Sequence, residues 1–390
     1  IRDTSLGHEV LHNWWGNGVY PDYTHGNWAE GLTTFMADYA YKERAGRSAA
    51  QEMRHGWLRD YAALPEGTEK PLAAFSSRTH SASAAVGYGK AAMLFYMVRE
   101  KIGTEAFDRA IRAFYRDYRF RRASWADVEA AFSRSSGQPL GPLFEHWLTR
   151  TGAPQLTIPS AAAKRAGSNW DLFVVLAQGT PPYPLDVPIA ISTTKGEKTV
   201  RVPLTQARNA ATITVQGKPL AVALDPEFQI WRQLATVESP PIMREAIAAR
   251  DPVIVNLNGS SDFARAVEVL ASALLERPAR SADTLPASAP VAILFGTPAD
   301  IDAALAAYRI DLRPEETKGR GTAQAWTVRR DNQTLLVISA KDVEALALLG
   351  RALPHLGSQS WAVFEGARPV ARGVWKAEAA RVPVRVSAGR

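Results

Sequence analysis

The stretch that decides the fold is His8-Glu9-Val10-Leu11-His12, close to the start of the chain. On a helix the two histidines are about 400° apart, or about 40° net, so both imidazoles project from one face and can bind one metal ion. Glu9 is turned about 100° away and is expected to meet a water molecule at the metal. The same pattern also occurs on ordinary helices as a solvated face, so the surrounding sequence has to decide.

The surrounding residues favour a helix. Thr4 or Ser5 can serve as the N-cap, and Gly16-Asn17-Gly18 is a stop signal, so we predict a helix over 4–15. A metzincin is disfavoured, because that pattern requires Gly and His at the positions that hold Trp15 and Gly18.

A third ligand is offered by Glu30, within Trp28-Ala29-Glu30-Gly31. Asn27 can cap a second helix that runs to about Arg44, which places Glu30 in its first turn. A catalytic zinc ion typically takes three protein ligands and leaves the fourth position to water. We therefore predict one zinc ion, held by His8, His12 and Glu30, and a hydrolase. The other histidines show no ligand spacing: His25, His55, His80, His146 and His355.

The two motifs resemble those of the gluzincin aminopeptidases related to membrane alanyl aminopeptidase. The resemblance extends to Gly87-Tyr88-Gly89-Lys90-Ala91 and, more loosely, to about residue 235. It implies a thermolysin-like helical lobe that cleaves peptides, in which Tyr88 donates a hydrogen bond to the oxyanion. Without the resemblance, a buried structural tyrosine would be the preferred interpretation of Tyr88.

This sequence departs from the family pattern in two ways. Seventeen residues separate His12 from Glu30, one fewer than is usual in the family, so the 18–26 loop must absorb a deletion. Asp22 is a weaker candidate ligand, because it lies in a Tyr-Pro-Asp-Tyr turn. The family segment that binds the substrate's amino terminus precedes the zinc motif, and the chain begins seven residues before His8. We therefore expect a piece of a longer protein, and exopeptidase and endopeptidase activity both stay open.

Composition excludes several classes of protein. The chain has no cysteine, which rules out disulfides and thiolate metal sites, and it has no apolar run long enough to span a bilayer. The net charge of +7 invites a nucleic-acid interpretation. The densest basic cluster, Arg112 to Arg122, has no nucleic-acid motif beside it, so an ordinary basic surface is favoured.

The chain is expected to be a multidomain α+β protein. Residues 1–151 show helical spacing and are predicted to form the helical zinc-peptidase lobe. Residues 152–238 contain seven short runs typical of strands, the last at Phe228–Arg232, and are predicted to form a β-sandwich. In residues 239–390 a strand is followed by a helix three times, and a hairpin closes the segment, which indicates an accessory α/β domain with a mostly parallel sheet.

The sequence thus predicts zinc-dependent hydrolysis of peptide bonds, with peptides as partners and no role for nucleic acid. Glu9 is the expected general base. The alternative is a peptide-binding or scaffolding protein with a vestigial zinc site, and the shortened spacing before Glu30 supports it. Against that alternative, every residue that the chemistry needs is present, Glu9 included.

Overall fold

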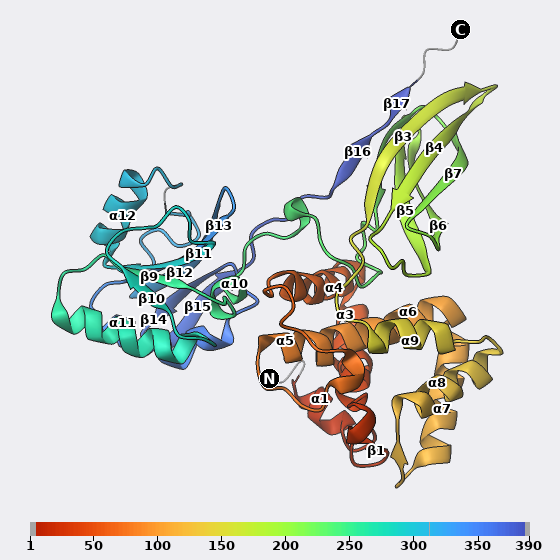
Figure 1. Cartoon of the computed structure of the whole chain (residues 1–390), viewed down its shortest axis with the longest axis horizontal. Helices are drawn as coiled ribbons and strands as arrows, with labels where there is room; N and C mark the ends of the chain where they lie inside the picture. The colour runs from red at the N-terminus through yellow and green to blue at the C-terminus, as the bar shows by residue number, and fades with distance from the viewer. Residues whose placement is uncertain (1–4, 312, 387–390) are drawn as a thin grey trace. The chain divides into compact units, whose positions relative to one another are not determined.

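The computed structural model describes residues 5–311 and 313–386. The chain forms two compact units. The first contains the described residues up to 61, residues 69–238 and the residues from 378 onward, and the second contains residues 62–68 and 239–377. In Figure 1 the first unit is drawn in colours from red to yellow-green, and the last blue strands also belong to it.

Helices make up the first part of the first unit (Figure 1). They are α1 (Ser5–Leu11), α2 (Ala29–Thr33), α3 (Ala40–Ala45), α4 (Arg47–Ala62), α5 (Ser81–Ala84), α6 (Ala91–Ile102), α7 (Thr104–Tyr118), α8 (Trp125–Ser136) and α9 (Gly141–Thr149). Two π-helical turns, η2 (Thr34–Tyr39) and η4 (Ala85–Lys90), continue α2 and α5. The 3-10 turns are η1 (Tyr23–His25) and η3 (Leu72–Ala74), and the short strands β1 (Tyr20–Pro21) and β2 (Arg122–Ala123) pair in parallel.

Helix α6 forms the centre of this helical region. Its residues from Ala91 to Tyr96 are buried, as expected for an apolar run in the middle of a core. Helix α2 packs directly on it, because a Cβ added at Gly31 would come within 2.2 Å of the Cβ of Ala91. Glycine is therefore required at position 31, and this close contact fixes the helix that carries Glu30.

Helix α1 ends at Leu11, before the predicted end at Trp15, while Thr4, at the start of the predicted span of 4–15, lies outside the described residues. The amide of His12 still donates to the carbonyl of His8 at 3.2 Å, but α1 ends at Leu11. The chain then turns, with the amide of Asn17 donating to the carbonyl of His12 at 2.9 Å. Gly16 permits this turn, because its φ of +131° is unfavourable for other residues.

Two four-stranded sheets follow the helical region. One has the order β17-β3-β4-β7 and the other β16-β8-β5-β6. Six of their strands follow one another directly along the chain: β3 (Thr157–Ala166), β4 (Asn169–Ala177), β5 (Leu185–Thr193), β6 (Gly196–Leu204), β7 (Arg208–Gln216) and β8 (Pro219–Leu224). Buried side chains such as Leu172, Val174, Ile189 and Ile191 come from both sheets, which is typical of a two-layer β-structure.

The predicted strand at Phe228–Arg232 is wrong. The backbone amides of Gln229 and Ile230 donate to the carboxylate of Asp225, at 2.7 Å and 3.2 Å, and so do not join a sheet. The guanidinium of Arg232 is buried in the same cluster, between Asp225 and Glu238. Burial alone raises the pKa of Asp225, but this ion pair and the two backbone donors oppose that rise.

The last described strands belong to the two four-stranded sheets, whereas the expected accessory domain included them. Strand β16 (Arg381–Pro383) pairs antiparallel with β8, and β17 (Arg385–Val386) pairs parallel with β3. Figure 1 shows both blue strands beside the yellow-green sheets. The amide of Glu378 also donates to the carbonyl of Val237 at 2.9 Å. The chain therefore returns to the first unit close to the point where it left.

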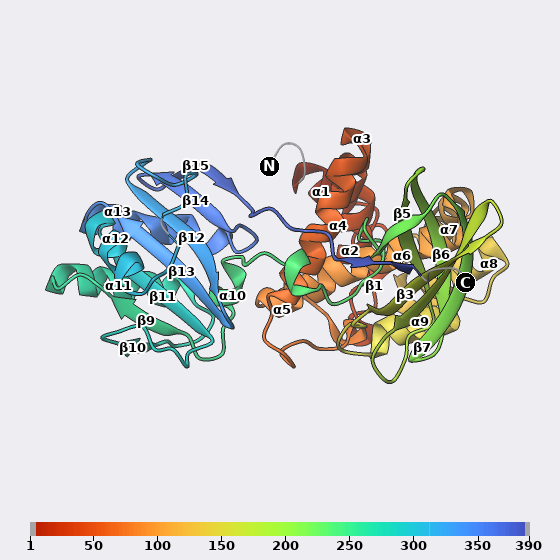
Figure 2. The same cartoon turned by 90° about the horizontal axis from the view of Figure 1, so that it is seen from above.

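The second unit contains a seven-stranded sheet with the order β10-β9-β11-β13-β12-β14-β15 (Figure 2). Its elements are α10 (Arg244–Ile247), β9 (Val253–Asn256), α11 (Ser261–Leu274), β10 (Arg280–Ala282), β11 (Val291–Gly296), α12 (Pro298–Ala307), β12 (Ala323–Arg330), β13 (Gln333–Ala340), α13 (Val343–Leu348), β14 (Trp361–Glu365) and β15 (Arg368–Gly373). Short 3-10 turns are η5 (Thr236–Glu238) in the first unit and η6 (Leu349–Arg351) and η7 (Leu353–His355) in this one.

This sheet is mixed, whereas a mostly parallel sheet was predicted. Strands β10, β9, β11 and β13 are parallel, but β12, β14 and β15 join antiparallel. The three predicted strand and helix pairs and the closing hairpin are present. Helices α11 and α13 bury their apolar residues against one face of the sheet, and α12 packs on the other.

Candidate metal centre

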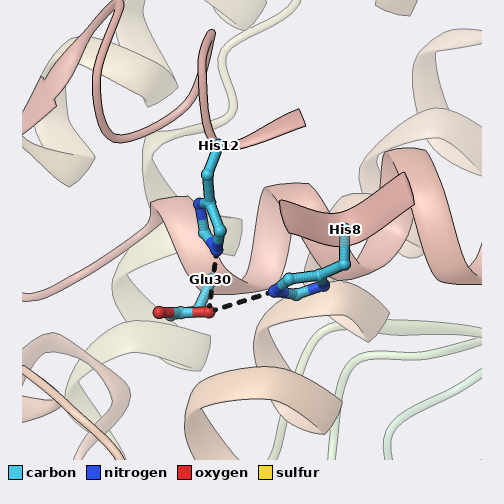
Figure 3. Close-up of side chains that lie close together, drawn as sticks. All are labelled: His8, His12 and Glu30. Atoms are coloured by element: carbon cyan, nitrogen blue, oxygen red, sulfur yellow. Dashed lines mark hydrogen bonds and ion pairs between the residues drawn. The ribbon is translucent and has the colours of Figure 1, made fainter. Parts of the chain in front are cut away.

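The structure brings the three predicted ligands together. His8 comes from α1, His12 follows the last turn of α1, and Glu30 lies in the first turn of α2. Their ligand atoms all lie within 4.8 Å of one another. Figure 3 shows both imidazoles directed at the same carboxylate oxygen, Oε2 of Glu30, with each Nε2 at 3.4 Å from it.

The second nitrogen of each imidazole is held by the protein. Nδ1 of His8 donates to Oδ2 of Asp38 at 2.8 Å, and Nδ1 of His12 donates to the carbonyl oxygen of Trp15 at 2.8 Å. With Nδ1 engaged in these hydrogen bonds, Nε2 is the nitrogen directed at a ligand, and a metal ion there would take the place of the second proton that the raised pKa keeps on the ring of His8. A carboxylate or carbonyl partner on the far nitrogen is typical of histidines that bind zinc.

Two of the three distances between the donor atoms match those of a tetrahedral zinc site, and all three lie within 4.8 Å. Zinc bonds to imidazole and carboxylate are about 2.0–2.1 Å long, so neighbouring ligand atoms of a tetrahedron lie about 3.3–3.4 Å apart. The two measured separations, from Nε2 of His8 and of His12 to Oε2 of Glu30, are 3.4 Å. Two nitrogen donors and one oxygen donor leave a fourth position for water, as in catalytic zinc sites.

The electrostatics of the site favour positive charge. Burial opposes the charged form of His8, but the hydrogen bonds and charges of Asp38 and Glu30 outweigh it and raise the pKa of His8 to about 9. Burial would raise the pKa of Glu30, but the two histidines outweigh it and lower that pKa to about 2. The carboxylate of Glu30 therefore stays ionised between two imidazoles, which suits the binding of a cation.

Asp38 is a site residue that the sequence analysis missed. It lies on η2, the π-helical turn that continues the Glu30 helix, and its side chain is 16% exposed. π-helical turns are rare and are frequent at functional sites. The available signal was an acidic residue on the same helix as Glu30, but no sequence pattern showed that it would meet His8.

Tyr88 lies on the second π-helical turn, η4, and its ring centroid is 6.2 Å from that of His8. Burial, followed by the nearby charge of Glu30, raises the pKa of Tyr88, so its hydroxyl keeps its proton. Phe75 packs edge-on against Tyr88 at 6.0 Å, and a Cβ at Gly87 would come within 2.1 Å of the Phe75 ring. The turn is thus fixed by a contact that requires glycine.

Glu9 is exposed, one residue after the buried His8. Its negative charge adds a small contribution to the raised pKa of Tyr88. Asp22, the weaker candidate ligand, lies outside the cluster, since it caps η1 and binds the ring of His25 at 2.7 Å. Within the described residues, His8, His12 and Glu30 form the metal-compatible cluster.

Comparison with known proteins relates the helical region to a peptidase family. Residues 3–147 match the model of the peptidase family M1 domain. The helical region of this chain is therefore similar to an M1 peptidase domain. The match begins before His8 and ends at Trp147, and so it includes every predicted site residue.

Relatives of the M1 domain carry the names of aminopeptidases or of associated factors. The Tricorn protease-interacting factor F2 of Thermoplasma acidophilum is 22% identical over 210 residues, which cover 50% of this chain and 25% of that protein. The leucyl aminopeptidase of Saccharolobus solfataricus is 25% identical, over 44% of this chain and 22% of that protein. The aminopeptidase M1 of Arabidopsis thaliana is 25% identical, over 46% and 20%. The aligned part is a quarter of these relatives' length or less.

A solved structure also resembles this chain. It is the aminopeptidase A of Legionella pneumophila in complex with aspartic acid, with 21% identity and a TM-score of 0.47. The alignment covers 68% of this chain and 30% of that one. Separately, among the described residues no helix combines the length and the apolar character needed to cross a bilayer.

Proposed function

We propose that this protein is a zinc-dependent peptidase that removes residues from the amino termini of peptides. The observation that carries the proposal is the cluster of His8, His12 and Glu30, whose donor atoms lie within 4.8 Å of one another, with Glu9 on the helix that carries His8. The match of residues 3–147 to the peptidase family M1 domain, whose aminopeptidases are zinc-dependent in general, supports it.

In this proposal His8, His12 and Glu30 hold one zinc ion. When bound, zinc polarises the scissile carbonyl and lowers the pKa of a coordinated water to about 7. The carboxylate of Glu9 takes the proton from the attacking water and passes it to the leaving amine. Its exposed position one residue after His8 suits a group that must reach both water and substrate.

Tyr88 is proposed as the oxyanion donor. Its hydroxyl stays protonated over the working pH range, because burial and the charge of Glu30 raise its pKa. A donor that is already oriented by packing stabilises developing negative charge without reorganising. Phe75 and the π-helical turn supply that orientation.

A peptide-hydrolysis assay with matched substrates tests the proposal. The purified protein would be incubated with a peptide that has a free amino terminus and with its N-acetylated counterpart, and the products would be identified by mass spectrometry. We expect cleavage of the free peptide, loss of cleavage with a chelator and recovery with zinc. Cleavage of the acetylated peptide as well would indicate an endopeptidase.

The competing function is a peptide-binding protein with a vestigial site. The shortened segment between His12 and Glu30 is the observation that favours it. This alternative predicts peptide binding with no hydrolysis at any zinc concentration. The same assay therefore separates the two functions.

A further inference from the structure

A small cavity shares a wall with the Tyr88 turn. Its volume is about 130 Å³, and it is bounded by the 70–80 loop, α5 and η4. Phe75 and Val86 supply apolar wall, while Ser76 and Ser77 supply hydroxyl groups. Phe75 also packs against the ring of Tyr88, and Val86 belongs to the same π-helical turn as Tyr88. The cavity is therefore next to the candidate metal centre.

The charge around this cavity is positive. Lys70 lines it, and no lining residue is acidic. Arg78 lies in the loop between two lining residues, and its side chain is exposed. In the part of the chain that the structure describes, no ion pair involves Lys70 or Arg78, whereas many other arginines are paired. The positive charge of Arg78 acts to lower the pKa of Tyr88, whereas burial and the charge of Glu30 raise it.

The cavity wall is fixed from two sides. The amide of Asn27 donates to the carbonyl of Phe75 at 2.7 Å, and the side-chain amide of Asn27 donates to the carbonyl of Ser76 at 3.0 Å. The amide of Ser83 donates to Nδ1 of His80 at 3.3 Å, which leaves Nε2 of His80 as a donor. Because Asn27 also accepts from the amide of Ala29 at 3.0 Å, the cavity is tied to the helix that carries Glu30.

We propose that this cavity binds a carboxylate of the peptide substrate, with Lys70 and Arg78 as the residues that select for it. The inference rests on the proposed function, in which a peptide substrate binds at the neighbouring metal centre. Two unpaired cations, hydroxyl groups and an imidazole donor match a carboxylate. Each residue of an extended peptide spans about 3.3–3.6 Å, so a group a few residues from the scissile bond reaches past the Phe75 ring.

The carboxylate has two possible sources on a peptide, the carboxyl terminus and an acidic side chain. Both present the same oxygen atoms to the cavity. A set of short peptides separates them: one pair differs by a free or amidated carboxyl terminus, and a second, amidated pair differs by Glu or Gln at an internal position. A preference within the first or the second pair identifies the source.

The test measures binding without turnover. Peptide affinities would be measured by calorimetry for zinc-loaded Glu9→Gln protein, alone and combined with Arg78→Gln, Lys70→Gln or both. Arg109→Gln is the matched control, because Arg109 is an exposed arginine on α7. We expect the parent to bind one carboxylate peptide about three- to tenfold more tightly than its neutral partner. The double variant should lose this preference and the control should keep it.

The inference would be overturned if the parent showed no preference in either pair, or if the double variant kept the preference of the control. Folding of each variant is checked by its thermal unfolding midpoint. Because binding is read directly, an absence of hydrolysis in the unmodified protein would contradict the proposed function alone. The carboxylate preference would still be judged by the affinities.

Discussion

Asp38 Oδ2 accepts a hydrogen bond of 2.8 Å from Nδ1 of His8, although the two residues are 30 positions apart. This contact orients the first predicted ligand and makes its Nε2 a better donor to a metal ion. His12 has only the neutral carbonyl of Trp15 in the corresponding place. The two imidazoles are therefore held by partners of different charge.

Replacing Asp38 with Asn should weaken zinc binding by about 10–100-fold, because the amide keeps an acceptor but loses the negative charge. Competition with a chromophoric chelator measures the affinity. Asp108→Asn, at an exposed position on α7, is the control and should bind zinc as the unmodified protein does. Equal affinities in both variants would show that Asp38 does not support the site.

His12→Ala and Glu30→Ala should each lose most bound zinc, because either change leaves two protein ligands. Metal analysis of the purified proteins measures the loss. Asp22→Ala is the matched control, since Asp22 is engaged with Thr24 and His25 on η1. If Glu30→Ala kept its zinc and Asp22→Ala lost it, Asp22 would be the third ligand and the assignment of Glu30 would be wrong.

Glu9→Gln should keep its zinc and its thermal stability and lose nearly all peptide hydrolysis. The side chain is exposed and glutamine has nearly the same shape, so folding should be unaffected, whereas the amide cannot accept the proton of the attacking water. Zinc content, unfolding midpoint and turnover would be measured on one preparation. Substantial residual turnover would remove Glu9 as the general base.

Tyr88→Phe should lower kcat and kcat/KM together by ~10² or more, with KM little changed, if the hydroxyl acts only in the transition state. Tyr20→Phe, at a site that is 41% exposed, serves as the control. A purely structural tyrosine would instead lower the unfolding midpoint and leave the turnover of folded molecules unchanged. That result would exclude the catalytic role.

Lys90 gives a prediction about pH and stability. Its side chain is 1% exposed and donates to the carbonyl of Arg150 at 2.7 Å, and burial lowers its pKa from 10.5 to about 8. Between these two values the unfolded chain binds more protons than the folded one, so the contribution of Lys90 to stability rises with pH.

The free energy of unfolding of the unmodified protein should therefore rise, relative to that of Lys90→Met, by roughly 3 kcal/mol across this range. Denaturant unfolding of both proteins at several pH values measures the difference. The comparison cancels the titration of all other groups. A difference that stays constant with pH would mean that the buried amine keeps its ordinary pKa.

The ligand cluster was predictable because its geometry is local. His8 and His12 are four residues apart, and a single loop leads to Glu30, so helix periodicity was enough. Asp38 was not predictable. It follows Glu30 by eight residues, and on a regular helix the two side chains would point in directions about 80° apart. The π-helical turn holds one more residue than an α-helical turn, and this extra residue brings Asp38 to the helix face that carries Glu30. That insertion reflects tertiary packing and has no signature in the sequence.

Strands were predictable where an apolar run marks them and were missed where a distant partner creates them. Arg381–Pro383 and Arg385–Val386 are too short to be identified alone, and they exist through pairing with β8 and β3. The opposite error was made at Phe228–Arg232, whose residue types favour a strand. There the carboxylate of Asp225 captures the backbone donors that a sheet would need.

The position of β16 and β17 in the chain sets an order of assembly on the ribosome. Strands β3 and β8 are synthesised before residues 239–377, but the strands that cover their edges follow after them. During that interval both edges present unpaired amide and carbonyl groups, which can pair with other chains. Residues 239–377 are thus inserted between strands of the same two sheets, and both sheets are completed only after this insertion has been made.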